Sequence, residues 1–300
     1  MLDSKNITAL VVNYNAGFWL VKSVTSLIES NVPLCIYVVD NHSTDDSIET
    51  LRNGVDSSSI KIIENTENRG FAAANNQVLN TVASDYFVLV NPDCMVEKDT
   101  VAKIIDVMER DTQIGLASCV IRNSNGEVQK TCRRDFPTPW SGLVRVLGLS
   151  RFFPRFRAFA DFDLGRPSEK DSVEFVEAIS GAFMVVKGET VKKVGLLDER
   201  YFMHCEDLDW CMRCWRSGYK VAFIPGAEVT HAKGISGNSN RMKVNWHLHK
   251  GMIHFYKKFY KEKYPLPIMW LVYSGIGVRF LAKGALLFFI SLLPSYASKP

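Results

Sequence analysis

Apolar runs that end at polar residues recur along the first 121 residues, and segments with apolar residues at helical spacing separate them. The runs are Ile7–Val12, Cys35–Val39, Lys61–Ile63, Tyr86–Val90 and Gly115–Ile121. Uninterrupted runs of this length are typical of strands buried on both faces of a parallel sheet. The alternation of strand and helix therefore predicts an α/β fold with a doubly wound, mostly parallel sheet and right-handed crossovers.

Polar side chains stand at the carboxyl ends of three of these runs, at Asn13, Asp40 and Asp93. Pro92 cannot donate a hydrogen bond to a sheet, so the fourth strand must end before Asp93. Ligands of open α/β sheets bind in the crevice at this end. Asp93 could hold a divalent metal on the phosphates of a nucleotide, although Asn-Pro-Asp is also ordinary turn chemistry. The recurrence at three strands favours a nucleotide site.

A second group of acids lies where a helix is expected to begin, near Glu206. Asp207 and Asp209 complete its first turn, and Leu208, Met212 and Trp215 share one face at helical spacing. Acids at a helix N-terminus complement the macrodipole and need no other reason. In a cleft, one of them could instead stay ionised and accept a proton. Both explanations remain open at this point.

His231 ends a pair of short strands expected at Val221–Ile224 and Ala227–Thr230. A single histidine is more often structural than functional, yet a neutral imidazole is a good metal ligand. The loop that follows is rich in glycine and serine, and it could close over phosphates. Its residues of interest are Gly234, Ser236, Gly237 and Ser239. By contrast, the segment from Arg133 to Asp171 has no clear period and is predicted to be a long loop.

The C-terminal region combines apolar, aromatic and basic residues. Val244–Tyr260 is predicted to be a helix, and Leu266–Leu293 is apolar except for Arg279 and Lys283. Two central cations make membrane spanning costly, which favours a segment lying in the cytoplasmic membrane interface. The alternatives are a spanning helix and a helix pair that packs on the domain or on a second subunit.

Composition narrows the function classes. Hydrophobic residues make up 47% of the 300 residues and charged ones 23%, as in a globular protein with a sizeable core. The net charge of +4 is too small to indicate nucleic acid as a partner. The basic excess gathers among aromatic residues, which predicts contact with an anionic inner membrane surface. Its members are Arg133, Arg134, Arg145, Arg151, Arg155, Arg157, Lys257, Lys258, Lys261 and Lys263.

Cysteine usage and the N-terminus indicate the compartment. The seven cysteines show no disulfide rhythm and are odd in number, which fits a reducing cytoplasm. Cys211 and Cys214 form a C-x-x-C without a second pair, so we interpret them as packing thiols rather than metal ligands. Because Met1–Asn6 is short and polar, no signal peptide is predicted.

Taken together, the motifs resemble those of inverting family 2 glycosyltransferases with the GT-A fold, close to the rhamnosyltransferase-like members that build bacterial cell-surface polysaccharides. The resemblance extends from about Ile7 to Ser239. It rests on V-V-N-Y-N (Val11–Asn15), V-V-D-N-H-S-T-D (Val38–Asp45), N-R-G-F-A-A-A-N-N (Asn68–Asn76), N-P-D (Asn91–Asp93), F-M-H-C-E-D-L-D-W (Phe202–Trp210) and His231.

The resemblance implies roles for individual residues. In such enzymes the ends of the first two strands hold the nucleoside base, here Val12, Asn13, Asn15 and Asp40. The Arg-Gly segment near the ribose and diphosphate corresponds to Arg69, Gly70 and Asn75. The D-x-D motif that binds Mg²⁺ or Mn²⁺ is reduced here to Asn91 and Asp93, and His231 matches a further metal ligand. Asp207 corresponds to the catalytic base, with Glu206, Asp209 and Trp210 shaping the acceptor and donor-sugar pocket.

The implied function is transfer of a sugar, with rhamnose as first expectation, from a dTDP- or UDP-linked donor to a saccharide or lipid-linked acceptor. The implied domains are a GT-A domain over 1–240, divided into a nucleotide-binding half (1–121) and an acceptor and catalytic half (122–240), and a helical membrane-associating segment over 241–300. We expect the protein to be peripheral on the cytoplasmic face of the membrane. The alternatives are a sugar nucleotidyltransferase, which would need a cationic glycine-rich loop after the first strand, and a non-catalytic nucleotide-sugar-binding scaffold.

Overall fold

The computed structural model describes residues 4–146, 149–152, 156, 163, 172–232 and 241–291, and these divide into two compact units. The sheet unit consists of Met1–Phe136, Asp163–Phe202 and Glu206–Ser236. The helical unit consists of Pro137–Phe162, Met203–Cys205 and Gly237–Pro300. The helical unit is therefore not a continuous C-terminal segment. Two internal segments, Pro137–Phe162 and Met203–Cys205, belong to it together with the C-terminal helices.

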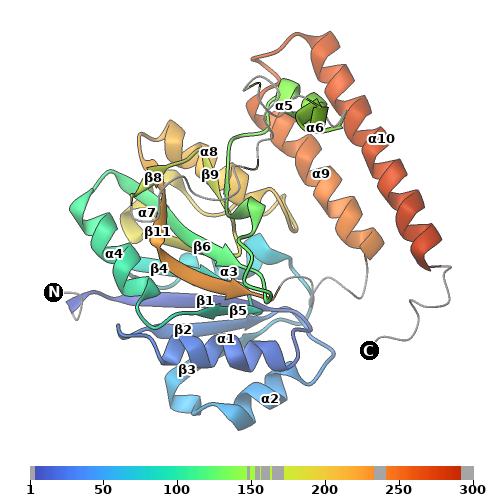
Figure 1. The fold of residues 1–300 in the computed structure, drawn as a ribbon. Coiled ribbons are helices and arrows are strands. Elements are labelled where there is room, and N and C mark those ends of the chain that lie inside the picture. Colours follow the sequence, from blue (N-terminus) through green and yellow to red (C-terminus); the bar gives the residue numbers. More distant parts are fainter. Residues whose placement is uncertain are drawn as a thin grey trace. The chain divides into compact units, whose positions relative to one another are not determined.

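The sheet unit is built on a nine-stranded sheet in the order β3-β2-β1-β4-β10-β6-β11-β5, with β8 paired to β11 (Figure 1). Its strands are β1 (Ile7–Asn13), β2 (Cys35–Asp40), β3 (Ile60–Glu64), β4 (Tyr86–Val90), β5 (Cys94–Val96), β6 (Ile114–Arg122), β8 (Glu174–Phe175), β10 (Phe183–Lys187) and β11 (Lys220–His231). The flanking helices are α1 (Phe18–Ile28), α2 (Ser47–Gly54), α3 (Phe71–Leu79), α4 (Thr100–Arg110), α7 (Gly188–Val194) and α8 (Glu206–Arg216). The predicted α/β architecture is confirmed.

The sheet is mixed, and its one central reversal positions the site. β1 to β4 are parallel, as the β-α repetition predicted, and β11 is parallel to β6. β10 runs antiparallel between β4 and β6, so that Phe183 at its start lies opposite Val90 at the end of β4. The beginning of β10 is thereby brought to the carboxyl ends of the parallel strands, where ligands of such sheets bind.

Two local expectations were wrong. The segment after Arg133 is not a single loop: β7 (Arg133–Arg134) pairs with β9 (Ala178–Ile179), and α5 (Pro139–Val146) and α6 (Leu149–Phe152) follow. The two strands expected around Pro225 are one strand, β11, with a register irregularity between Ile224 and Glu228. A strand can continue through a proline at a bulge, because the bulged residue is not paired with the neighbouring strand and so needs no backbone N–H to donate.

The helical unit contains α5, α6, α9 (Arg241–Phe259) and α10 (Leu266–Ser291). α10 packs on α9 and on α5, and the Tyr256 hydroxyl of α9 donates to the Thr138 carbonyl, 3.1 Å away. Among the described residues, α10 alone combines the length and apolar composition that crossing a membrane would require, and little of it is buried.

Gly70 is the residue on which the start of α3 depends. Its φ of 84° is in the region that favours glycine, and a Cβ added there would lie 2.5 Å from the carbonyl oxygen of Phe202. The same carbonyl accepts the N–H of Phe71 at 2.8 Å. The contact fastens the first turn of α3 to the chain that leads toward α8.

We expect Gly70→Ala to lower the free energy of unfolding by about 2–3 kcal/mol, since it adds backbone strain to a steric clash. Urea denaturation followed by circular dichroism measures the change. The matched control is Gly226→Ala in β11, where no atom lies within 4 Å of the added Cβ. An equal effect of the two substitutions would contradict this explanation.

Candidate active site

The ends of β1 and β2 are tied together by polar side chains. Asn13 and Asp40 are register partners, and the Asn13 Nδ2 donates to the Asp40 Oδ1 at 2.7 Å. The Asp40 carboxylate also accepts from the Ser43 hydroxyl at 2.6 Å and from the Ser43 N–H at 3.0 Å. Both side chains are buried, as is Val12. The two strand ends therefore form one rigid polar rim at the edge of the sheet.

Asn15 extends this rim to the loop after β2. Its φ of 52° is unusual for a residue with a side chain, and its amide oxygen accepts the N–H groups of Thr44 and Asp45 at 2.7 and 3.3 Å. Asparagine tolerates this conformation because its amide can bond locally to the backbone.

Near α3, Arg69 is exposed and Asn75 is buried, with the Asn75 Nδ2 donating to the Phe71 carbonyl at 2.9 Å. The Oδ1 of Asn75 is buried and has no hydrogen-bond partner among the described residues.

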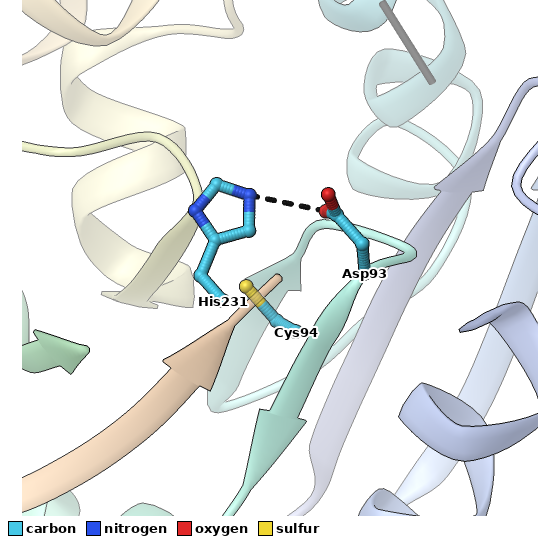
Figure 2. Close-up of side chains that lie close together, drawn as sticks. All are labelled: Asp93, Cys94 and His231. Atoms are coloured by element: carbon cyan, nitrogen blue, oxygen red, sulfur yellow. Dashed lines mark ion pairs between the residues drawn. The ribbon is translucent and has the colours of Figure 1, made fainter. Parts of the chain in front are cut away.

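Asp93, Cys94 and His231 bring three potential metal ligands together at the sheet edge (Figure 2). β5 and β11 are antiparallel, and their register sets His231 opposite Cys94. The His231 Nε2 lies 3.1 Å from the Asp93 Oδ1, and the ligand atoms of all three residues lie within 4.8 Å of one another.

The chemistry of these side chains separates two ligands from the third. Burial raises the pKa of the Cys94 thiol well above its usual value, and the Sγ donates to the Ala182 carbonyl at 3.4 Å. His231 is held from its other side by Gln129, whose Nε2 is 3.2 Å from the Nδ1. Asn91 reaches the same imidazole, with its Nδ2 3.5 Å from the Nε2. A carboxylate and an oriented imidazole, with a protonated thiol beside them, fit an ion that accepts mixed oxygen and nitrogen ligands, such as Mn²⁺.

Asp207, in the first turn of α8, is held by three donors. The Arg134 Nη2 donates to its Oδ2 at 2.5 Å, the Gly181 N–H to the same oxygen at 3.0 Å and the Leu208 N–H to Oδ1 at 2.7 Å. Burial alone would raise the pKa of Asp207, but the Arg134 charge and the Gly181 N–H outweigh it and lower the pKa. An ionised carboxylate has about four acceptor positions. One position on Oδ1 therefore remains for a further donor.

Glu206 has the opposite electrostatic character. Its burial, together with the neighbouring Asp207 charge, raises the pKa of Glu206 to about 8. Its Oε2 is buried and has no hydrogen-bond partner among the described residues. At neutral pH the adjacent acids thus carry one negative charge, which is located on Asp207.

The turn before β10 connects Asp207 to the metal-ligand cluster. Gly181 donates its N–H to Asp207, and the carbonyl of the next residue, Ala182, accepts the Asn91 N–H at 2.9 Å and the Cys94 thiol. A Cβ at Gly181 would meet the Asp207 Cβ at 3.3 Å, so the approach is close. The ionised carboxylate of α8 and the ligand cluster therefore lie at the same end of β10.

Asp209 and Trp210 turn inward. Asp209 is fully buried and accepts from the Arg213 Nε at 2.6 Å, and the Trp210 Nε1 donates to the Gly195 carbonyl at 2.9 Å. The Trp210 contact, together with the Arg213 Nη2 donating to the Leu196 carbonyl at 2.8 Å, fixes α8 on the loop after α7.

Arg134 is the site residue that sequence reasoning missed. It stood out only as one member of a basic cluster, within a segment expected to be a loop. The signal was present in Arg133-Arg134, since adjacent arginines in a stretch that buries its neighbours need carboxylate partners. The glycine- and serine-rich loop expected at Gly234–Ser239 lies outside the described residues.

Comparison of the sequence with known proteins identifies a family and several relatives. Residues 8–162 match the family model of glycosyl transferase family 2. The N-acetylglucosaminyl-diphospho-decaprenol L-rhamnosyltransferase of Mycobacterium tuberculosis is 25% identical over 288 residues, which cover 91% of each chain. The dTDP-rhamnosyl transferase RfbF of Shigella flexneri is 24% identical over 236 residues, 77% of this chain and 70% of that one.

Among solved structures, the mannosyltransferase PcManGT of Pyrobaculum calidifontis, in complex with GDP-Man and Mn²⁺, superimposes with a TM-score of 0.60. It is 17% identical, and the match covers 98% of this chain and 82% of that chain. At that identity the likeness shows the fold alone.

The elevated pKa of Glu206 generates a prediction about stability. Between its ordinary value of 4.5 and about 8, the folded protein holds a proton that the unfolded chain has lost. The free energy of unfolding should therefore fall as pH rises through this window, by up to about 1.4 kcal/mol per pH unit. Glu206→Gln should remove this slope, whereas Glu49→Gln, an exposed acid in the first turn of α2, should retain it. Denaturant melts at several pH values measure the slopes, and identical slopes for wild type and Glu206→Gln would contradict the assignment.

Proposed function

This chain belongs to glycosyl transferase family 2, and from that premise we propose that it transfers rhamnose from a dTDP-linked donor to a lipid-linked saccharide, with inversion at the anomeric carbon. The sugar and the acceptor class are suggested by the names of its M. tuberculosis and S. flexneri relatives. Asp207 acts as the base in a single in-line displacement, and a divalent metal supports the leaving diphosphate.

The observation that carries the proposal is the pairing of two different polar groups across the start of β10. On one side lies an ionised carboxylate with one acceptor position left, and on the other lies a carboxylate-imidazole pair suited to a metal. An inverting transfer needs both, because the acceptor hydroxyl loses a proton while negative charge grows on the departing diphosphate.

On the donor side, the proposal gives the polar rim of Asn13, Asn15 and Asp40 to the nucleoside, with Val12 beneath it. Rigidity supports this role, since a rim held by internal hydrogen bonds loses little entropy when a ligand binds. The exposed Arg69 provides a cation for the diphosphate beside the Gly70 turn, and Asn75 offers a buried acceptor in the first turns of α3.

A lowered pKa suits the base in this reaction. Because its pKa is lowered, Asp207 is ionised at any physiological pH, and every enzyme molecule has the carboxylate ready to accept a proton. As the acceptor oxygen bonds to the oxocarbenium-like carbon, its proton becomes strongly acidic, and a weak base then suffices. Arg134 and Gly181 hold the carboxylate in one orientation, and the neutral Glu206 beside it lines the acceptor side without adding repulsive charge. Asp209 and Trp210 contribute through the placement of α8.

Asp93 and His231 are the residues that would hold the metal, with Asn91 beside them. Bound there, Mn²⁺ or Mg²⁺ would neutralise charge on the diphosphate, which removes the need for a general acid. The imidazole ligand favours Mn²⁺, because Mg²⁺ prefers oxygen ligands alone.

We further propose that the protein works at the cytoplasmic face of the membrane. The apolar, largely exposed α10 and the basic α9 support this, since a lipid-linked acceptor must be met at the bilayer surface. α10 would lie in the interface rather than cross it, because Arg279 and Lys283 stand near its middle.

Assaying the protein with nucleotide sugars and Mn²⁺ for released nucleoside diphosphate tests the function without knowledge of the acceptor. Release from dTDP-rhamnose above other donors supports the proposal. Pyrophosphate release from a nucleoside triphosphate and a sugar phosphate would indicate a nucleotidyltransferase, and binding without any turnover would indicate a scaffold.

Asp207→Asn should lower kcat by about 10²- to 10⁴-fold while changing the Kd for the nucleoside diphosphate by less than about threefold. Retained nucleotide binding, measured by calorimetry, also reports that the variant is folded. Asp106→Asn on the exposed side of α4 is the control and should have no effect on either quantity. Turnover near the wild-type rate in Asp207→Asn would contradict the role of the base.

His231→Ala should raise the Mn²⁺ concentration for half-maximal activity by about 10- to 100-fold. Cys94→Ala should change it by less than about threefold, because the protonated thiol is a poor ligand. Electron paramagnetic resonance of free Mn²⁺ measures binding independently of turnover. Equal effects of the two variants would show that the ion is held elsewhere.

A further inference from the structure

The charges of this chain are divided unevenly between its two units. The segments of the helical unit contain 14 Lys and Arg residues but only two acids, Asp161 and Glu262. Its net charge is therefore +12, although the whole chain carries only +4. An excess of this size within a small unit attracts anionic partners, because the unit has few carboxylates of its own.

α10 packs on α9 through part of its surface and exposes large apolar side chains along its whole length. Arg279 contacts Met252 of α9 through its Nη1, and the Phe280 carbonyl accepts from the Asn245 Nδ2 at 3.2 Å. Lys283 lies one helical turn after Arg279 and is exposed. The exposed large side chains of the helix are Leu266, Ile268, Trp270, Leu271, Val278, Leu281, Leu286, Phe288 and Phe289. The two cations therefore stand within an exposed apolar surface that suits acyl chains.

Arg279 and Lys283 lack a carboxylate partner within the described part of the chain. The Arg279 guanidinium touches the Met252 Sδ at 3.2 Å, which is a weak acceptor for a charged donor. Arg279 and Lys283 repel one another, and Arg145 of α5 adds to the repulsion on Arg279. The two neighbouring cations Arg279 and Lys283 are unfavourable together unless an anion joins them.

Two fully buried polar atoms beside these cations also lack partners. The His249 Nδ1 bonds to the Asn245 carbonyl at 2.7 Å, while the His249 Nε2 and the Asn245 Oδ1 have none among the described residues. His249 is packed against Phe280, with ring centroids 5.6 Å apart, and its burial, together with the nearby charges of Arg279 and Lys283, lowers its pKa. Unsatisfied buried polar groups can accept a hydrogen bond from, or donate one to, a water or a bound ligand, so these two atoms could support a polar ligand next to the cations.

We propose that Arg279 and Lys283, with Arg145 beside them, form a binding site for the diphosphate of a lipid whose chain lies along the exposed apolar side chains of α10. The site deepens the proposed function, on which it rests, by locating the acceptor's phosphates. A diphosphate carries two or more negative charges on closely spaced oxygens, which match a cluster of cations better than the single charge of an ordinary anionic phospholipid.

Chain order connects this site with catalysis. Met203–Cys205 packs within the helical unit, where a Cβ on Gly251 of α9 would lie 2.9 Å from the His204 carbonyl. Cys205 interacts electrostatically with Arg279 and is followed directly by Glu206 and Asp207. The segment Met203–Cys205 of the helical unit is therefore continuous in sequence with the acids of α8.

Vesicle sedimentation of the full chain tests the site without donor or turnover. The probe is geranylgeranyl diphosphate at a few mole per cent in phosphatidylcholine vesicles. The comparisons are vesicles of equal negative charge made with phosphatidylglycerol and vesicles that contain the neutral alcohol geranylgeraniol. Wild type should bind the diphosphate vesicles about tenfold more tightly than the phosphatidylglycerol vesicles. Equal binding to both would overturn the proposal, since it would reveal general attraction to anionic surfaces.

The double variant R279Q/K283Q should reduce that preference to less than about twofold. K257Q/K261Q removes the same charge from exposed positions at the end of α9 and just after it, so it should weaken binding to both anionic vesicles alike and keep the preference. R279K/K283R should retain the preference, and circular dichroism melts report folding. Loss of the preference in K257Q/K261Q but not in R279Q/K283Q would overturn the assignment. Donor hydrolysis, measured separately, tests the proposed function, so the two can fail independently.

Discussion

The ion pair between Arg134 and Asp207 is the interaction on which the candidate active site depends. It is buried on both sides, with exposed side-chain fractions of 13% and 12%, so each charge would be strongly destabilised without the other. The pair keeps Asp207 ionised, and burial together with that fixed charge raises the pKa of Glu206. Two adjacent acids thereby acquire different protonation states, so that a charged carboxylate and a neutral neighbour stand side by side.

The reversal of one strand gives this ion pair its location. Because β10 is antiparallel to β4, its first residues meet the end of β4 and carry hydrogen bonds in both directions, from Gly181 to Asp207 and from Asn91 to Ala182. The short β7–β9 ladder sets Arg134 opposite Ala178, a few residues before Gly181. Sheet topology therefore determines the electrostatics of the site. The turn before β10 lies beside the Asp207 carboxylate, the Arg134 side chain and the potential metal ligands.

Much of the sheet could be predicted from the sequence, because buried parallel strands leave unbroken apolar runs and a β-α alternation. The acids at strand and helix ends, including Asp93 and Asp207, also stood out from local chemistry and from the resemblance to known enzymes. Neither source gives the direction of an apolar run such as Phe183–Lys187, so the antiparallel β10 went unforeseen. Arg134 was missed for a related reason. It is 73 positions from Asp207, and only the fold reveals their pairing.

The two units also differ in how their charges are balanced, and this difference bears on contact with a membrane. In the sheet unit, the buried ion pairs described above join an arginine to an acid, whereas the helical unit collects cations beside an apolar helix. Under the proposed function, the helical unit would bind a lipid phosphate and the sheet unit a nucleotide. The proposed base, Asp207, would then have to remain charged whatever the pH at the bilayer surface.

Carboxyl ¹³C NMR titration of protein labelled at Asp and Glu tests this central claim most directly. The account predicts that the Asp207 resonance stays at the ionised position between about pH 5 and pH 9, while the Glu206 resonance titrates near its elevated pKa. An Asp207 resonance that titrates within this range beside an ionised Glu206 would contradict it.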